Sequence, residues 1–379
     1  MKQYIPLGDV ISKASVDRCG NAQFPILSIT MKDGLVLQDE KFKKRIASVD
    51  TSDYKVIPRG KLVQGIHIDE ANFGIQDIVD VGIVSPAYKV WDVNSDVVFP
   101  KYLEMVMRSP RSIAFYKSKL NGSVNRRGRM TDGDFLGMPV PYFELSEQMR
   151  IVDIMIRSKA IIEERMQQLL TLDDLIKARF VEMFGECKTS CPASSFMSDL
   201  RNGVSPSTSG KIHAKVLTLS AITQGKFDPD MWKDGLFDED PPADKRITAT
   251  DFYMCRGNGN KKLVGAGVCS ATDREDLVFP DTVIAAHVDT SQVSLPYLFV
   301  AWMLPEVRDQ IEAGARTTNG TFKINQQIIS RIKVPIPPIE LQNQFATFIA
   351  QIDKSKFAIQ QSLKETQTLF DSLMQQYFG

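Results

Sequence analysis

The histidines and cysteines of the sequence form no catalytic or metal-binding constellation. His67, His213 and His287 stand far apart, and none belongs to an HExxH motif or has a cysteine at ligand spacing. We interpret each as a structural or surface residue. The five cysteines are odd in number and contain no CxxC pair, which is typical of reduced thiols in a cytoplasmic protein.

Two further motifs contain residue types that catalysis uses, and both lack the rest of their pattern. Gly257–Lys262 (GNGNKK) does not have the spacing of a phosphate-binding loop or a dinucleotide turn. Asp240–Ala243 (DPPA) is similar to the DPPY tetrad of amino-methyltransferases, but alanine replaces the aromatic residue that would stack on a base. No cofactor-binding glycine motif precedes it and no PD…(D/E)xK nuclease cluster is evident. The sequence therefore predicts a chain that is not an enzyme and holds no metal or cofactor.

Basic segments at similar places in the two halves have the composition of a DNA contact. Asn125–Arg129 (NRRGR) and Arg316–Lys323 (RTTNGTFK) lie in glycine-bearing loops, each after a helical stretch. Arginine and lysine bind phosphates and guanine edges, and asparagine binds adenine edges. A single charge run is more often a solvated face, but the repeated placement favours DNA. The candidates for DNA contact are Lys61, Arg126, Arg127, Arg129, Lys211, Lys215, Lys261, Lys262, Arg316, Asn319 and Lys323.

Composition limits what kind of DNA-binding protein this is. The 379 residues suffice for two domains, and 46 basic residues balance 46 acidic residues. Zero net charge argues against a non-specific nucleic-acid coat, which is strongly basic, but allows a local basic surface. No apolar run reaches the length of a membrane span, and the N-terminus has no signal-peptide pattern.

The sequence is an internal repeat. Residues 139–148 (PVPYFELSEQ) match residues 335–344 (PIPPIELQNQ) at an offset of 196, and FVEMFG (180–185) matches MQQYFG (374–379) at an offset of 194. This difference predicts a second helix about two residues shorter than the first. Weaker matches pair PILSI with KVLTL, and DYKVI with DFYMC; Arg-Gly follows each of the last two closely.

Each copy ends in a long segment with a heptad pattern and no internal glycine or proline. Each helix would be roughly 50–55 Å long, at about 1.5 Å per residue. A narrow apolar stripe of that length needs a matching helix, so we expect the two to pair within the chain; the alternative is that each packs on its own domain. The predicted seam consists of Val152, Met155, Ile162, Met166, Leu169, Ile176, Ile349, Ile352, Ile359, Leu363, Phe370 and Leu373.

The segments before the helices mix short strand-like runs with helical patches at 100–118 and 295–313. They predict a compact α/β or α+β domain in each half, with one mostly antiparallel sheet. The boundaries are 1–143 for the first domain, 144–185 for the first helix, 186–338 for the second domain and 339–379 for the second helix.

The duplicated order of domain, Pro-apolar-Pro, Glu-Leu-x-x-Gln and long helix ending in Phe-Gly resembles the specificity subunit of type I restriction-modification systems over the whole chain. Ile5–Val10 (IPLGDV) and, more weakly, Phe196–Leu200 (FMSDL) resemble the entries into that family's two target-recognition domains. The first copy departs from the pattern only in having Tyr142-Phe143 at the second proline position.

The resemblance implies a pseudo-twofold protein with two target-recognition domains and two antiparallel coiled-coil spacer helices. Each domain would read one half of a bipartite, asymmetric site in double-stranded DNA. Two modification subunits would dock on the helices, bind S-adenosylmethionine and methylate adenine. Restriction subunits would complete a cytoplasmic prokaryotic complex for antiviral defence.

Other functions stay open at this point. A specificity subunit of a related type II (IIB/IIG-like) enzyme would have almost the same sequence pattern. A free-standing methyltransferase would need the cofactor motif that is missing here. A coiled-coil scaffold would bind only proteins and would protect all DNA sequences equally.

Overall fold

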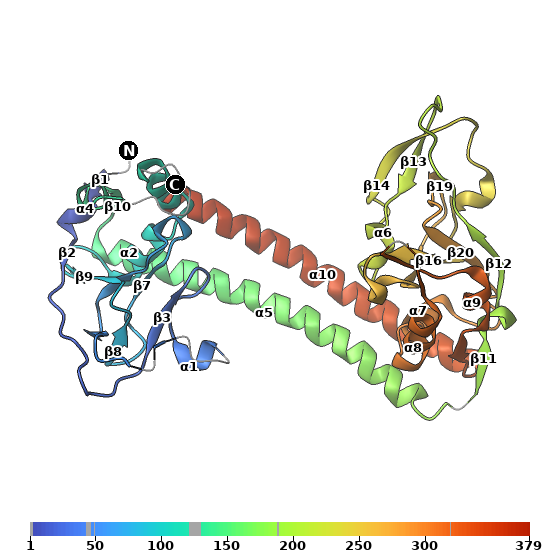
Figure 1. Ribbon diagram of the computed structural model, residues 1–379, viewed down its shortest axis with the longest axis horizontal. Coiled ribbons are helices and arrows are strands. Elements are labelled where there is room, and N and C mark those ends of the chain that lie inside the picture. Colours follow the sequence, from blue (N-terminus) through green and yellow to red (C-terminus); the bar gives the residue numbers. More distant parts are fainter. Residues whose placement is uncertain (1–2, 43–46, 49, 121–129, 188, 319) are drawn as a thin grey trace. The chain divides into compact units, whose positions relative to one another are not determined.

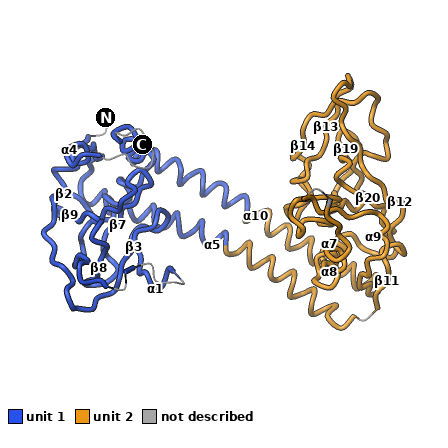
Figure 2. Tube along the Cα trace, in the orientation of Figure 1, with its two compact units in different colours: residues 1–166, 360–379 blue, residues 167–359 orange. Residues whose placement is uncertain are grey.

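The computed structural model describes residues 3–42, 47–48, 50–120, 130–187, 189–318 and 320–379. The chain forms two compact units, residues 1–166 with 360–379 and residues 167–359 (Figure 2). Two helices of 40 residues each contribute to both units: α5 (Leu145–Phe184) and α10 (Ile339–Phe378) (Figure 1). Within the described residues, no helix is long and apolar enough to cross a membrane.

Unit 1 contains one four-stranded sheet and three two-stranded sheets among its described residues, with four short helices and two 3-10 turns. The four-stranded sheet has the order β2 (Ile11–Lys13), β9 (Lys89–Val93), β6 (Leu62–Gln64), β7 (Phe73–Ile75). The pairs are β1 (Gln3–Pro6) with β10 (Pro139–Tyr142), β3 (Leu27–Thr30) with β4 (Gly34–Leu37), and β5 (Lys55–Pro58) with β8 (Val81–Val84). The helical elements are η1 (Leu7–Asp9), α1 (Gln38–Lys41), η2 (Ile68–Glu70), α2 (Pro100–Met107), α3 (Pro110–Lys119) and α4 (Asp132–Leu136).

Unit 2 contains two four-stranded sheets, one three-stranded sheet and one strand pair among its described residues. The first sheet has the order β12 (Met197–Asn202), β20 (Val283–Val288), β16 (Asp251–Cys255), β18 (Gly267–Cys269); the second has β14 (Trp232–Phe237), β13 (Ile212–Leu217), β19 (Arg274–Val278), β15 (Arg246–Ile247). The smaller sheets are β17 (Gly257–Asn258), β22 (Thr321–Lys323), β21 (Arg316–Thr318), and β11 (Ser190–Pro192) with β23 (Lys333–Pro335). The helical elements are η3 (Ala193–Ser195), α6 (Ser220–Thr223), η4 (Ala243–Lys245), η5 (Lys261–Leu263), α7 (Leu295–Ala301), α8 (Pro305–Gly314) and α9 (Gln326–Arg331).

The two units share their strand topology. The order β2-β9-β6-β7 in unit 1 corresponds to β12-β20-β16-β18 in unit 2. Likewise β3-β4 and β5-β8, linked by a parallel bridge between Ile26 and Ile83, correspond to β13-β14 and β15-β19, with β13 parallel to β19. The α/β class of each half is therefore confirmed, but the expectation of one sheet per half was wrong. In unit 2 the two four-stranded sheets pack through apolar side chains: Tyr253 of β16, in the first sheet, and Leu277 of β19, in the second, belong to one buried cluster.

The topology corrects one of the sequence matches. DYKVI contains β5, which pairs with β8, whereas DFYMC is β16, which pairs with β20 and β18. The counterpart of β16 is β6, and that of β5 is the short strand β15. Both runs are apolar, so composition alone aligned strands that belong to different sheets.

The two predicted helical patches are each broken once. Helix α2 ends at Met107 and α3 begins at Pro110, and likewise α7 ends at Ala301 and α8 begins at Pro305. A residue that precedes proline is disfavoured in helical conformation, and Ser109 and Leu304 accordingly have extended backbones. The hydroxyl of Ser109 then accepts a hydrogen bond from the Ser112 amide and caps α3.

The helices α5 and α10 have equal length, so the prediction of a shorter second helix was wrong. Their starts and ends are each separated by 194 residues (339 − 145 and 378 − 184). At this offset Gln148 corresponds to Gln342, and both side chains are buried. Gln344, which the sequence match paired with Gln148, is exposed. Alignment on the Glu-Leu pairs, Glu144-Leu145 and Glu340-Leu341, gave an offset of 196, two residues more than the offset of the helices.

Gln148 and Gln342 make equivalent hydrogen bonds at the start of their helices. Gln148 accepts from the Phe99 amide at 2.8 Å and donates to the carbonyls of Val97 and Phe143. Gln342 accepts from the Ser294 amide at 2.9 Å and donates to the carbonyls of Gln292 and Pro337. Each amide thus satisfies buried backbone groups that would otherwise have no partner, and joins its helix to the globular part of its unit.

Aromatic packing joins the end of one helix to the start of the other within each unit. In unit 2, Phe184 near the end of α5 lies 5.4 Å from Phe345 of α10 and 4.9 Å from Tyr297, between ring centroids. In unit 1, Phe378 at the end of α10 lies 5.6 Å from Tyr102, and α5 contributes Val152 and Met155 to the same core. The helices are therefore antiparallel in both units, as the family resemblance implied.

The buried row of α5 differs from the predicted seam at one member. Met166 is 54% exposed, and the preceding residue, Arg165, is half-buried instead. Ser158 and Leu172, one heptad before and after Arg165, are likewise buried or half-buried. Hydrophobicity favoured the apolar Met166, but Arg165 can lie in the row because arginine can cover a helix with its aliphatic stem. Ser158 can lie in the row because its hydroxyl donates to the Ile154 carbonyl. The other predicted members, all buried or half-buried, are Val152, Met155, Ile162, Leu169, Ile176, Ile349, Ile352, Ile359, Leu363, Phe370 and Leu373.

The burial of Gln342 and the exposure of Gln344 predict that substitutions at these two positions affect stability differently. Gln342→Ala leaves the Ser294 amide and two carbonyls without their partner, so we expect a loss of about 1–3 kcal/mol in the free energy of unfolding. The matched control, Gln344→Ala, removes an exposed side chain and should change it by less than about 0.5 kcal/mol. Urea unfolding measures both variants, and equal effects would contradict the corrected alignment.

Candidate nucleic-acid interface

The three-stranded sheet β17-β22-β21 brings the predicted basic segment Arg316–Lys323 close to the predicted contacts Lys261 and Lys262. Lys323 of β22 is the register partner of both Arg316 in β21 and Gly257 in β17. Lys261 and Lys262 follow β17 directly in η5. Residues about 60 positions apart in the sequence thus form one cluster, which we call the basic sheet: Lys261, Lys262, Arg316 and Lys323.

Local sequence explains why the basic sheet forms. Gly320 between β21 and β22 has a φ of 75°, a value that favours glycine, so the chain can reverse there. The side chain of Asn260 accepts a hydrogen bond from the Lys262 amide and caps η5. Arg316, Lys323 and Lys262 are exposed, and no ion pair joins a residue of the basic sheet to any carboxylate that the structure describes. Their charges are therefore available to an anionic partner.

Three other predicted DNA contacts lie elsewhere, and two of them have acidic partners. Lys215 on β13 pairs with Asp276 at 3.0 Å and lies 5.0 Å from the centroid of the Trp232 ring. Hydrogen bonds from Arg274 and Lys215 lower the pKa of Asp276 well below its usual range, so this group keeps its negative charge. Lys61 pairs with Asp92 in unit 1. Lys211 is exposed and has no ion pair among the described residues.

The remaining candidates, Arg126, Arg127, Arg129 and Asn319, lie outside the residues that the structure describes. The Asp240–Ala243 motif is accounted for by a contact within the protein, because Asp240 accepts a hydrogen bond from Arg246 at 2.8 Å.

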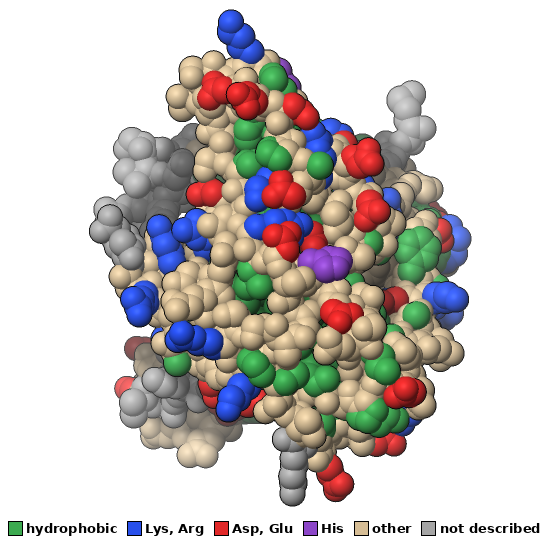
Figure 3. Space-filling view, turned by 90° about the vertical axis from the view of Figure 1, so that its right-hand side faces the viewer, with side chains coloured by type: hydrophobic (Ala, Val, Ile, Leu, Met, Phe, Trp, Pro, Cys, Tyr) green, Lys and Arg blue, Asp and Glu red, His purple; other side chains and the backbone are tan. Residues whose placement is uncertain are grey.

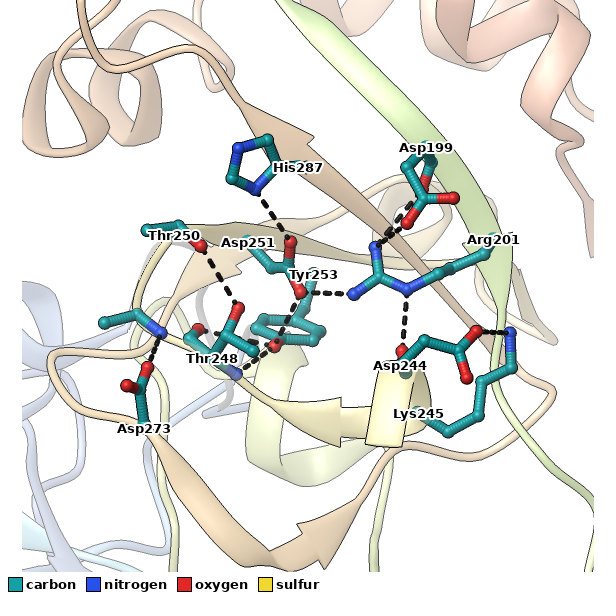
Figure 4. A network of polar contacts seen from close by, with 11 residues as sticks. Asp199, Arg201, Asp244, Lys245, Thr248, Thr250, Asp251, Tyr253, Asp273 and His287 are labelled. Carbon is teal, nitrogen blue, oxygen red and sulfur yellow. Dashed lines mark hydrogen bonds and ion pairs between the residues drawn. The ribbon is translucent and has the colours of Figure 1, made fainter. Parts of the chain in front are cut away.

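A polar hollow in unit 2 contains residues that the sequence did not single out (Figure 4). It has a volume of about 330 Å³ and is lined by Ser198, Asp199, Arg201, Thr248, Thr250, Asp251 and His287. Asp251 is 2% exposed and accepts from Arg201 Nη2 at 2.5 Å and from the Tyr253 hydroxyl at 3.3 Å. His287 Nδ1 lies 3.7 Å from the other oxygen of Asp251. No sequence signal links these residues, which strand pairing alone brings together.

The hydrogen bonds of the hollow use every nitrogen of Arg201. Its Nε donates to the Asp244 carbonyl at 2.7 Å, and its Nη1 donates to the Asp199 carbonyl at 3.2 Å. Burial raises the pKa of Tyr253, so its hydroxyl remains a donor to Asp251. We call the hollow defined by the lining residues above the Arg201 hollow.

The face of the molecule in Figure 3 carries basic side chains interspersed with acidic ones rather than a continuous basic surface.

Comparisons with known proteins find structural likeness without sequence likeness. No protein-family model and no curated protein matches the chain. A type I restriction-modification S subunit from M. genitalium matches with a TM-score of 0.59 at 9% identity, covering 100% of this chain and 96% of its own. A chain from a structure of the assembly and conformational transition of a type I R-M system matches with a TM-score of 0.59 at 15% identity, covering 99% and 97%.

The chain has the fold of type I S subunits. The HsdS subunit from Thermoanaerobacter tengcongensis is also similar, at 16% identity with a TM-score of 0.49 and coverage of 100% and 96%. The two matches with a TM-score of 0.59 cover 99% and 100% of this chain, so the shared fold includes both units and the helices α5 and α10.

The structure separates basic residues that stabilise unit 2 from basic residues that are free to bind. Arg201→Met leaves the carboxylate of Asp251 buried without its ion pair, which should cost about 3–5 kcal/mol of stability. Arg316→Gln with Lys323→Gln should cost less than about 0.5 kcal/mol, since both side chains are exposed. Thermal and urea unfolding test this contrast; a stable Arg201→Met protein would show that the ion pair is dispensable.

Proposed function

We propose that this protein is the DNA-specificity subunit of a type I restriction-modification complex. One observation carries the proposal: the chain is a duplicated module with the S-subunit fold, and its second copy presents a basic sheet without acidic partners among the described residues. In this proposal, units 1 and 2 each read one half of a bipartite, asymmetric DNA site.

The helices supply the reason for a bipartite site. A continuous helix of 40 residues is roughly 60 Å long at about 1.5 Å per residue, which exceeds the length of one turn of B-DNA, about 34 Å. A pair of such helices can hold two reading units at successive turns of a duplex. We propose that α5 and α10 set the gap between the half-sites.

The same helices offer exposed apolar side chains that a partner could cover. On α5, Ile156 and Leu170 are 48% and 57% exposed, and Phe357 on α10 is 69% exposed. We propose that two modification subunits dock on these helices and that restriction subunits join them. Catalysis and S-adenosylmethionine binding would then reside in the partners, with this chain contributing no catalytic residue. The neighbour described with the assembly of a type I R-M system supports subunit partners in general.

The basic sheet provides the direct test of this proposal. In a complex of the full chain with its modification subunit, Arg316→Gln with Lys323→Gln should weaken binding to duplex DNA. The slope of log K against log salt concentration should become shallower by about 0.9 for each phosphate that the altered side chains no longer bind. Fluorescence anisotropy at several salt concentrations measures both quantities.

A matched control uses basic residues that have acidic partners. Arg18→Gln with Arg59→Gln removes two charges outside the helices that pair with Asp53 and Asp80, and it should leave the salt slope unchanged. If both double variants bind DNA like the unaltered protein, the basic sheet is not a DNA contact. If the complex of the unaltered chain binds all DNA sequences equally, the chain is not a specificity subunit.

A further inference from the structure

The Arg201 hollow occupies the same place in unit 2 that an ion pair occupies in unit 1. In unit 2, His287 of β20 is the register partner of Ser198 in β12 and of Asp251 in β16. In unit 1, Asp92 of β9 is the register partner of Ser12 in β2. Leu62 opposite Trp91 then places Lys61 opposite Asp92, with which it forms an ion pair.

The chemistry at this shared place differs between the units. Serine is present in both, but Asp251 replaces Lys61 and His287 replaces Asp92. Positions that hold the common fold are chemically alike in both units, as the pairs Gln148–Gln342 and Tyr102–Tyr297 show. A surface that docks identical partners would also be alike in both. A position that differs fits a role in telling one DNA half-site from the other.

The exposed charged group of the hollow is a hydrogen-bond acceptor, the carboxylate of Asp199. All three nitrogens of Arg201 already have acceptors, and its guanidinium carbon lies 5.8 Å from the centroid of the Phe279 ring, which covers it on that side. The side chain of Asp199 is 67% exposed, and its Oδ2 pairs with Arg201 Nη1 at 3.2 Å. The side chain of His287 is 50% exposed. The hydroxyls of Thr248 and Thr250 complete the lining. Such a surface repels phosphate and suits a group that donates hydrogen bonds.

A β-bulge directs Asp199 into this place. The pairing of β12 with β20 is irregular between Ser198 and Arg201, and Asp199 within that bulge has a φ of 47°. Left-handed conformations are rare for residues other than glycine, asparagine and aspartate. Bulges redirect side chains and are frequent beside functional sites.

We propose that the Arg201 hollow reads the exocyclic amino group of a cytosine or an adenine in the half-site of unit 2. This inference rests on the proposed function and names the determinant of its specificity. In the major groove only cytosine N4 and adenine N6 donate hydrogen bonds. The carboxylate of Asp199 accepts one from the amino group, and Asp251 orients His287, a positioning contact made from within the protein.

Selection from a random duplex library tests the proposal, using the full chain in complex with its co-expressed modification subunit. Asp199→Asn keeps the shape and tolerates the left-handed backbone, but it removes the negative charge that pairs with Arg201 Nη1 and adds a donor that competes with the amino group. We expect the preference for C or A at one position of one half-site to fall about tenfold, the size of a good base contact. His287→Gln should alter the same position, and the other half-site should stay unchanged.

The controls use the exposed pair of His213 and Asp234, which lies outside the hollow and is joined at 2.7 Å. Asp234→Asn and His213→Gln should select the same site as the unaltered protein. An identical site for Asp199→Asn and His287→Gln would overturn the proposal while leaving the proposed function intact. Failure of these two variants to bind the modification subunit would also overturn it, in favour of a protein contact. A complex that enriches no sequence even without substitutions would overturn the proposed function itself.

Discussion

Two long helices that cannot be stable alone determine how the rest of this protein is built. Each has 40 residues and a narrow row of buried side chains, interrupted by polar groups such as Ser158 and Lys356. A row of this kind is stable only against a matching helix. Lys356 illustrates the match within unit 2, because its ammonium group pairs with Asp173 of α5 at 2.5 Å. Neither copy of the module could therefore bury its helix without the other copy.

The helix ends show how a globular unit can change while the frame is kept. Buried glutamines join each helix start to the backbone of its unit, and Phe184 and Phe378 complete aromatic cores formed around Tyr297 and Tyr102. These contacts involve backbone groups and apolar rings, so they place few demands on surface side chains. The sheet faces are free to differ, as the exchange of Lys61–Asp92 for Asp251–His287 shows. This combination supports the proposal that two identical docking sites accompany two different DNA-reading units.

The sequence was sufficient to predict the duplication, the pairing of the two helices and the mixed class of the domains, because heptad spacing and proline positions are local signals. The antiparallel orientation of the helices was an expectation from the family resemblance. It failed where polar residues occupy buried places: the pattern favours Gln344 and Met166, whereas the structure buries Gln342 and half-buries Arg165. It could also foresee the basic segment at Arg316–Lys323, but not its union with Lys261 and Lys262, which depends on strand pairing. The Arg201 hollow had no local signal, because its members lie on three strands and on the turn before β16.

The proposed role of the helix pair is to fix the gap between two half-sites. Sequencing of methylated DNA from cells that contain this chain and its modification subunit measures that gap directly. Deletion of one heptad from each helix, residues 162–168 and 361–367, shortens the pair by roughly 10 Å. We predict that both half-sites stay the same while the gap between them shrinks by about 3 base pairs, at roughly 3.4 Å each. An unchanged gap in a complex that still methylates DNA would contradict this role.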